Sequence, residues 1–176
     1  MSITDQELRD LVANLAISQA KTDAQIAKTD AKFKTMQKML DGISGNQGSV
    51  AEEFFYNSLK SKPVLGNIQF DRVTPQLIVG RKGKQNEYDV VLVNGASVGI
   101  VEVKYKAHVN DLEQVHAKVQ RFRTDCPEFK DFAIYGGIAG LSVPHAVSEA
   151  AKVQGLFVLT RKGVALDVQT EGMREF

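Results

Sequence analysis

Two carboxylates and a lysine alternate along a pair of predicted strands. Asp89 lies in one strand, and Glu102 and Lys104 lie in the next, where side chains two residues apart face the same side of a sheet. Most of their neighbours are apolar, as in interior strands, where an ionised carboxylate is costly unless it is paired or bound to a metal. Two such acids suit Mg²⁺ or Mn²⁺, which lowers the pKa of bound water and neutralises charge on a phosphoryl oxygen. The lysine can position or deprotonate the attacking water, or hold a phosphate oxygen. The alternative is a structural acid–lysine salt bridge at a sheet edge.

Whether the two acids meet depends on the turn between their strands. The pair Asn94-Gly95 is a strong hairpin signal, because both residues tolerate a positive φ. A two-residue loop makes Glu102 the diagonal neighbour of Asp89, and a four-residue loop places the two directly opposite each other. Either even loop length puts Asp89, Glu102 and Lys104 on one face. An odd length would move Asp89 to the other face.

The spacing of these residues resembles the signature of the PD-(D/E)xK nuclease superfamily. Twelve residues separate Asp89 from the segment Glu102-Val103-Lys104, which is similar to the family's D-(x)n-(E/D)-x-K pattern across a hairpin. The segment Gly48-Ser49-Val50-Ala51-Glu52 resembles the G-x-x-A-E start of the first helix in archaeal Holliday-junction-resolvase-like members. Tyr88 stands where the motif has proline. The resemblance covers most of residues 48–140.

The resemblance implies a role for each residue. Asp89 and Glu102 would be ligands of a Mg²⁺ or Mn²⁺ ion, and Glu52 would assist the metal or its water. Lys104 would be the catalytic lysine. Gln114, early on the next predicted helix, matches a position where some members place a polar active-site residue.

Two further glutamates are weaker candidates. Glu53 is the alternative to Glu52, but Glu52 shares a helical face with Phe55 and Leu59, the face expected to pack on the sheet. Glu87 points to the active face in the even-loop registers, although a glutamate at the start of a strand is more often solvated.

Basic residues near these acids could contact DNA phosphates, which positions a duplex without reading its sequence. The alternative for the run at residues 81–84 is a solvated hairpin tip. The DNA-binding candidates lie in the loop before the Asp89 strand, just after Lys104 and on the following helix: Arg81, Lys82, Lys84, Lys106, Lys118 and Arg121, with Arg123 beside them.

The elements that must position these residues alternate along residues 46–176. A helix is expected over 49–61, strands over 68–79, 87–93 and 97–105, a helix over 111–125, a strand over 132–138, a helix over 144–154 and strands over 156–160 and 164–168. Asn110 is expected to cap the helix at 111–125, with Glu113 reaching back. The fold class is α/β, with a mixed central sheet flanked by helices. By resemblance it is a restriction-endonuclease-like αβββαβ core.

Residues 1–45 are expected to form a separate coiled-coil helix. Seven-residue spacing places Val12, Gln19, Ile26, Phe33 and Leu40 in one column, and a second column starts at Leu8 and Leu15 and continues through Thr22, Thr29, Met36 and Ile43. So long a helix with so thin an apolar stripe needs a partner, so we expect a homo-oligomer through residues 8–43. The alternative is a solitary helix folded onto its own domain. Glycines 42, 45 and 48 are expected to form a hinge.

Composition excludes several classes of protein. The chain has 176 residues with 43% hydrophobic and 24% charged residues, typical of a globular protein, and a net charge of +1, too small to indicate nucleic-acid binding by itself. The single cysteine, Cys126, excludes an internal disulfide, and it is expected to be a packed thiol. The three histidines, His108, His116 and His145, are expected to be structural. With no membrane span or signal peptide in the pattern, we expect a cytoplasmic protein.

Together these observations predict a metal-dependent DNA endonuclease that is structure-selective or weakly sequence-specific. Two other functions are open: a catalytically inactive DNA-binding module, or a protein-interaction module within a larger repair, restriction or mobile-element complex.

Overall fold

The computed structural model describes residues 6, 14–15, 18–26, 47–81 and 83–176. The chain divides into two units, Met1–Gly45 and Asn46–Phe176, each taken here by itself. In the first unit, residues 14–15 and 18–26 are helical, and the predicted seam residues Leu15 and Ile26 are 65% and 55% exposed. The coiled coil stays a prediction, because most of its columns, and Gly42 and Gly45 of the expected hinge, lie outside the described residues.

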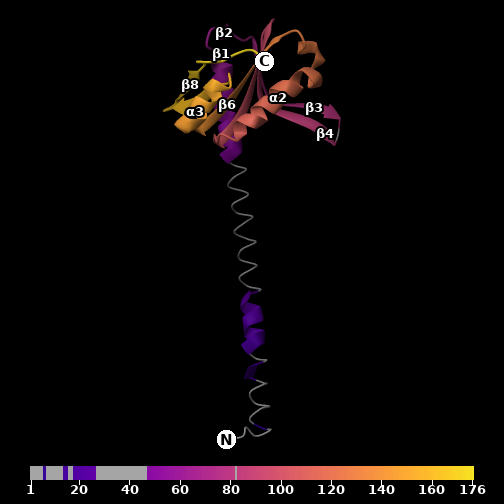
Figure 1. The fold of residues 1–176 in the computed structure, drawn as a ribbon, viewed down its shortest axis with the longest axis vertical. Helices are drawn as coiled ribbons and strands as arrows, with labels where there is room; N and C mark the ends of the chain where they lie inside the picture. The colour runs from indigo at the N-terminus through magenta and orange to yellow at the C-terminus, as the bar shows by residue number, and fades with distance from the viewer. Residues whose placement is uncertain (1–5, 7–13, 16–17, 27–46, 82) are drawn as a thin grey trace. The chain divides into compact units, whose positions relative to one another are not determined.

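A six-stranded mixed sheet forms the centre of the second unit (Figure 1). Its order is β3-β4-β5-β6-β7-β8, with β5-β6 and β6-β7 parallel and the other pairs antiparallel. The strands are β3 (Arg72–Arg81), β4 (Lys84–Val93), β5 (Ser97–Lys106), β6 (Ala133–Ser142), β7 (Phe157–Lys162) and β8 (Ala165–Gln169). A separate small hairpin joins β1 (Val64–Leu65) to β2 (Ile68–Gln69).

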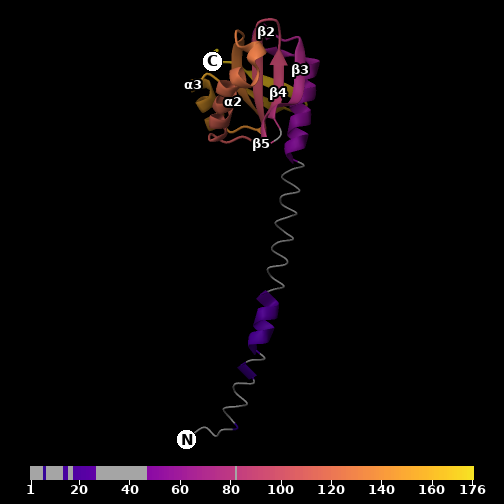
Figure 2. The same ribbon diagram turned by 90° about the vertical axis from the view of Figure 1, so that its right-hand side faces the viewer.

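Helices cover both faces of this sheet, as the view in Figure 2 shows. The helix over residues 47–61 packs one face through Ala51, Phe55 and Leu59, which are fully buried and spaced four residues apart. On the other face lie α2 (Asp111–Asp125) and α3 (His145–Val153). The short helix η1 (Pro127–Phe129) follows α2, and β6 precedes α3. The predicted αβββαβ order and the mixed α/β sheet are therefore confirmed. Among the described residues, no helix is both long and apolar enough to cross a lipid bilayer.

Three local predictions are wrong. The strand expected over 68–79 is divided between β2 and β3. Gly48 lies within the helix over 47–61 and forms no hinge. Asn110 makes no side-chain cap; instead the Asp111 carboxylate accepts a hydrogen bond from the backbone N–H of His108 at 2.7 Å, which satisfies a donor just outside the helix.

The hairpin between β4 and β5 has the four-residue loop. Val93 pairs with Val98, and the carboxamide oxygen of Asn94 accepts hydrogen bonds from the backbone N–H groups of Ala96 and Ser97. No positive φ is needed in this turn, because the asparagine side chain closes it. The loop length is even, as the prediction for Asp89 requires, and the register places Asp89 across from Glu102.

Two adjacent glycines in β6 leave room for the side chain of Val119 from α2 on one face and for the ring of Phe157 from the neighbouring strand β7 on the other. A Cβ atom on Gly136 would lie 2.5 Å from Val119 Cγ2 of α2, and one on Gly137 would overlap the ring of Phe157. Because adjacent strand residues face opposite sides of the sheet, the missing side chain of Gly136 makes room on the α2 face and that of Gly137 makes room on the other face. The α2 helix can therefore pack directly onto the strand beside β5.

Replacing Gly136 should separate α2 from the sheet. We expect Gly136→Ala to lower the free energy of unfolding by about 1–3 kcal/mol, because the branched Val119 cannot move aside cheaply. Urea denaturation measures this change. Gly95→Ala is the matched control, since Gly95 is exposed and has open space around it, and it should change stability by less than about 0.5 kcal/mol. Equal effects of the two substitutions would contradict the close approach.

Candidate active site

Asp89 and Glu102 meet on the α2 face of the sheet, around one ammonium group. The Lys118 Nζ of α2 lies 3.3 Å from Asp89 Oδ1 and also forms an ion pair with Glu102 Oε2. Glu102 is 4% exposed and is the buried charged residue of the described core. The prediction that both carboxylates share one face is confirmed.

The backbone pairing of β4 with β5 ends next to Asp89, and the Asp89 carboxylate accepts a hydrogen bond there in its place. Pairing between β4 and β5 ends at Val90 and Val101, so the next backbone groups of β5 no longer bond to β4. The N–H of Val103 instead donates to Asp89 Oδ2 at 2.7 Å. This bond satisfies a buried donor and fixes the carboxylate of Asp89 beside β5.

Lys104 is held by two acceptors. Its Nζ donates to Glu102 Oε1 at 2.9 Å and to Gln114 Oε1 at 3.1 Å, so the structure brings together the predicted lysine, acid and amide. Burial works to lower the pKa of Lys104, but the hydrogen bond and charge of Glu102 outweigh it and raise the pKa above its usual value. Lys104 is therefore an ammonium at neutral pH, suited to positioning a water or a phosphate oxygen rather than to removing a proton.

The environment disfavours the charge of Asp89. Burial, and next the charge of Glu102, raise the pKa of Asp89, while the Val103 N–H and the Lys118 ammonium act in the opposite direction. Two like charges are thus held together in a site with little water.

Glu52 lies on the other side of Asp89. Its Oε2 accepts a hydrogen bond from Gln76 Nε2 at 3.3 Å, and the structure records no contact between Glu52 and either acid of the pair. Glu52, Glu53, Gln76 and Asp89 nevertheless line one cavity of about 300 Å³, with Ser49, Tyr56 and Pro75. Glu52 and its alternative Glu53 therefore share a cavity with Asp89, but the structure records no hydrogen bond between either of them and Asp89.

Gln76 is a site residue that the sequence analysis missed. It lies in β3 across from Asp89, between the flanking pairs Pro75–Val90 and Leu77–Tyr88. Its φ is 45°, the one positive value among the described non-glycine residues. A long side chain in this region is strained, and such strain is often found at functional sites. A proline inside an expected strand was the available signal of irregular backbone.

The alternation of side chains shifts at Asp89. Val90 and Leu92 pack towards the helix over 47–61, but Tyr88 packs with α2, where its ring meets Phe122 edge-on and its hydroxyl donates to Asp125 at 2.6 Å. At Asp89, therefore, the side chains of β4 switch between the face of the helix over 47–61 and the face of α2. This places Asp89 between the cavity and the Lys118 ammonium.

The two acids fit a divalent cation. Asp89 Oδ1 and Glu102 Oε2 both face one position, which the Lys118 ammonium takes in this structure, and carboxylate oxygens are the ligands that Mg²⁺ prefers. In the part of the chain that the structure describes, no three His, Cys, Asp or Glu side chains gather closely enough to hold a metal. A metal here would take two protein carboxylates and complete its shell with water or substrate.

The predicted DNA-binding residues lie in different environments. Arg81, Lys84 and Lys106 are exposed, and Arg121 is exposed with a 2.7 Å hydrogen bond to Asn86. Lys118 instead lies in the carboxylate site, and Lys82 is outside the described residues. Arg123 is structural, because its guanidinium donates to the backbone carbonyls of Lys130, Phe132 and Phe176. Glu87 is exposed in β4 and pairs with Ile78.

The remaining candidates make no site. Cys126 is buried, and burial, followed by Glu128 and Asp125, raises its pKa to about 11, so it is a packed thiol as predicted. His116 bonds to Gln154 at 2.8 Å, and His145 lies 3.9 Å from Glu149.

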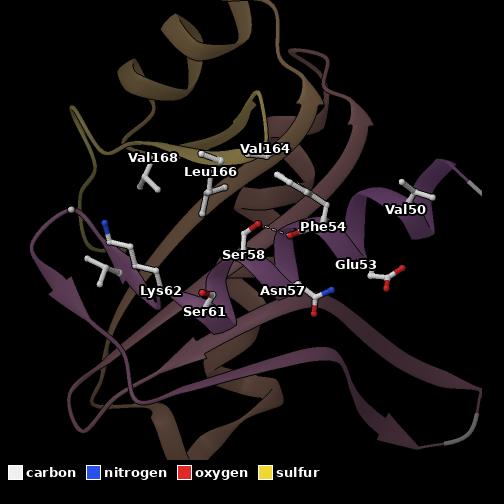
Figure 3. A pocket seen from close by; sticks show the side chains of 13 residues that line it. Val50, Glu53, Phe54, Asn57, Ser58, Ser61, Lys62, Val164, Leu166 and Val168 are labelled. Carbon is white, nitrogen blue, oxygen red and sulfur yellow. Dashed lines mark hydrogen bonds between the residues drawn. The ribbon is translucent and has the colours of Figure 1, made fainter.

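A larger hollow of about 930 Å³ lies between the helix over 47–61 and the segment around β8 (Figure 3). Phe54 and Ser58 line it from the helix, and Val164 and Leu166 lie opposite. Glu53 and Lys62 are the charged residues among its described lining residues, which include no pair of acids like the one between β4 and β5.

No protein-family model matches the chain, and no curated protein matches it in sequence. Two solved structures are similar to it. A repair endonuclease from Pyrococcus abyssi is 16% identical over 63% of this chain, with a TM-score of 0.45. A protein from Vibrio cholerae is 13% identical over 64% of this chain, with a TM-score of 0.41. The chain spans less than half the length of either, 46% of the first and 29% of the second.

Proposed function

We propose that this chain is a metal-dependent nuclease that hydrolyses phosphodiester bonds in DNA. The observation that carries the proposal is the meeting of Asp89 and Glu102 at one cation position, beside an ammonium on Lys104 that Glu102 and Gln114 hold in place. A metal held by two carboxylates, with a positioned cation next to it, can activate a water and stabilise the charge that develops on a phosphoryl group.

A purely structural salt bridge accounts poorly for this arrangement. Two carboxylates and two ammonium groups lie in a site where Glu102 is 5% exposed at its side chain and Lys118 is 22% exposed. Burying charges costs several kcal/mol per ion, and apolar residues of similar size often stabilise a fold at least as well. The raised pKa of Asp89 also argues against a purely structural role, because it means that the fold disfavours the charged form of this acid.

Each residue has a role in this proposal. Asp89 and Glu102 would hold Mg²⁺ or Mn²⁺, with Glu52 reaching it through the shared cavity. The bound metal would supply an activated water and a positive charge for the phosphoryl group. Lys104 would orient the attacking water or hold a non-bridging phosphate oxygen, and Gln114 would keep its ammonium aimed at the site.

The substrate and assembly are parts of the same proposal. The exposed Arg81, Lys84, Lys106 and Arg121 would contact phosphates along DNA, and contacts of this kind favour structure-selective or weakly sequence-specific binding. Self-association through residues 8–43 would bring two active sites to a duplex or branched DNA, one for each strand.

One observation favours a second function. Because Lys118 already forms ion pairs with both acids, the chain could be an inactive nuclease-fold module that binds DNA, or a partner protein, without a metal. Such a module would retain DNA at low salt in EDTA and would cut nothing.

Removing the Lys104 ammonium should abolish cleavage. With linear, supercoiled and four-way-junction DNA in Mg²⁺ or Mn²⁺, we expect cutting by the native chain, none in EDTA, and a loss of about 100-fold or more in Lys104→Ala. Lys162→Ala is the control for charge, since Lys162 is exposed at the end of β7. A folded native chain that cuts none of these DNAs in either metal would support the inactive module instead.

Neutralising Asp89 should stabilise the metal-free chain. Because the folded state raises the pKa of Asp89, it binds that proton more tightly than the unfolded chain does, and stability falls as the pH rises through the interval between the two values. Asp89→Asn avoids this loss. Its melting temperature in EDTA should exceed that of the native chain at pH 7, and the difference should disappear in acid.

The control for this measurement is Asp131→Asn, because Asp131 is an exposed aspartate. Its melting temperature should follow that of the native chain at each pH. A lower melting temperature of Asp89→Asn at pH 7 would show that the carboxylate is a net stabilising group.

A further inference from the structure

Each oxygen of the two acids already has a partner, and the partners differ in kind. Asp89 Oδ2 accepts from the backbone of Val103, and Glu102 Oε1 accepts from Lys104. The remaining oxygens, Asp89 Oδ1 and Glu102 Oε2, share the Lys118 ammonium. Among the described residues, Lys118 is therefore the one cation that bridges the two acids.

The Lys118 side chain is also the partner that can leave. A backbone N–H is fixed by its strand, and Lys104 has a second acceptor in Gln114 that holds it. Lys118 extends from the middle of α2 on a flexible four-carbon stem, with 22% of its side chain exposed, and its Nζ lies 6.0 Å from the centre of the Tyr88 ring. A rotation of the stem would move the ammonium out without moving the helix.

A divalent cation and this ammonium cannot occupy the same position between the two oxygens. Without either, two carboxylates facing each other in a site of low polarity would repel strongly. Lys118 thus offsets that repulsion when no metal is bound, and its own charge opposes the entry of a metal.

We propose that Lys118 is the resident cation of this site: a divalent metal displaces it from Asp89 and Glu102, and the freed ammonium then contacts a DNA phosphate. The inference rests on the metal site of the proposed function and adds an order of events, in which metal binding releases a cation for the substrate. It also gives Lys118 both of its roles, the ion pairs seen here and the phosphate contact predicted from its place on the helix.

The first test measures metal affinity, not activity. Calorimetric titration of the full chain with Mn²⁺ at pH 7 should show about tenfold or tighter binding to Lys118→Met than to the native protein, because a competing charge has been removed. Lys162→Met loses the same charge from an exposed position at the end of β7, and its affinity should stay near the native value. Lys118→Arg keeps the competing charge and should also bind Mn²⁺ like the native chain.

The second test uses the native protein and does not depend on how the Lys118→Met variant folds. Acetylation of lysines, followed by mass spectrometry, should label Lys118 several-fold faster in saturating Mg²⁺ than in EDTA, because the metal releases its ammonium from the two acids. Labelling of the exposed Lys106 should not change.

The outcomes separate this inference from the nuclease proposal. The resident-cation role would be overturned, even if the chain cuts DNA, by either of two results. One is equal Mn²⁺ affinity of Lys118→Met and the native chain, and the other is an acetylation rate of Lys118 that is the same in Mg²⁺ and in EDTA. The expected shifts without any cleavage would support the role of Lys118 and overturn the nuclease. Failure of every form of the chain to bind Mn²⁺ would overturn both.

Discussion

The main constraint on the sheet domain is that two like charges are held together between neighbouring strands. Asp89 and Glu102 would repel each other in a site with little water, and two ammonium groups offset that repulsion. Hydrophobic packing gains nothing from this arrangement, since an apolar pair would fill the same space at lower cost. The packing of the core therefore does not account for this arrangement, whereas the proposed metal site would.

Several features of the fold meet this requirement together. The end of pairing between β4 and β5 leaves the Val103 N–H for Asp89, so the acid is anchored by backbone rather than by a movable side chain. Gly136 lets α2 approach the sheet, and the same helix carries Lys118 to the two acids and Gln114 to the Lys104 ammonium. Gln76 takes a strained backbone conformation across from Asp89. Strain, close approach and interrupted pairing thus coincide at one place, as is common where a fold serves a reaction.

Patterns with a short range were predicted well from the sequence. The helix over 111–125 agrees with α2 at both ends, because its apolar positions recur at helical spacing, and the order of strands and helices follows from alternation and from glycine and proline at the boundaries. The common face of Asp89, Glu102 and Lys104 follows from the two-residue period of a strand once the loop is even. Turn chemistry was predicted less well. The Asn94 side chain closes a four-residue loop, and the choice between two even loops depends on hydrogen bonds that spacing does not specify.

By itself the sequence determined the elements, their order, and the acids and lysine that share one strand face, since these depend on neighbours within a few residues. Only the tertiary structure decided which residues surround those acids. Lys118 reaches them because α2 packs against the sheet beside β5. Gln76 meets Glu52, 24 residues earlier in the sequence, because β3 and the helix over 47–61 come together at one cavity. Such contacts join segments whose separation along the chain carries no periodic signal. Their positions are set by how side chains pack between layers, a property of the whole fold.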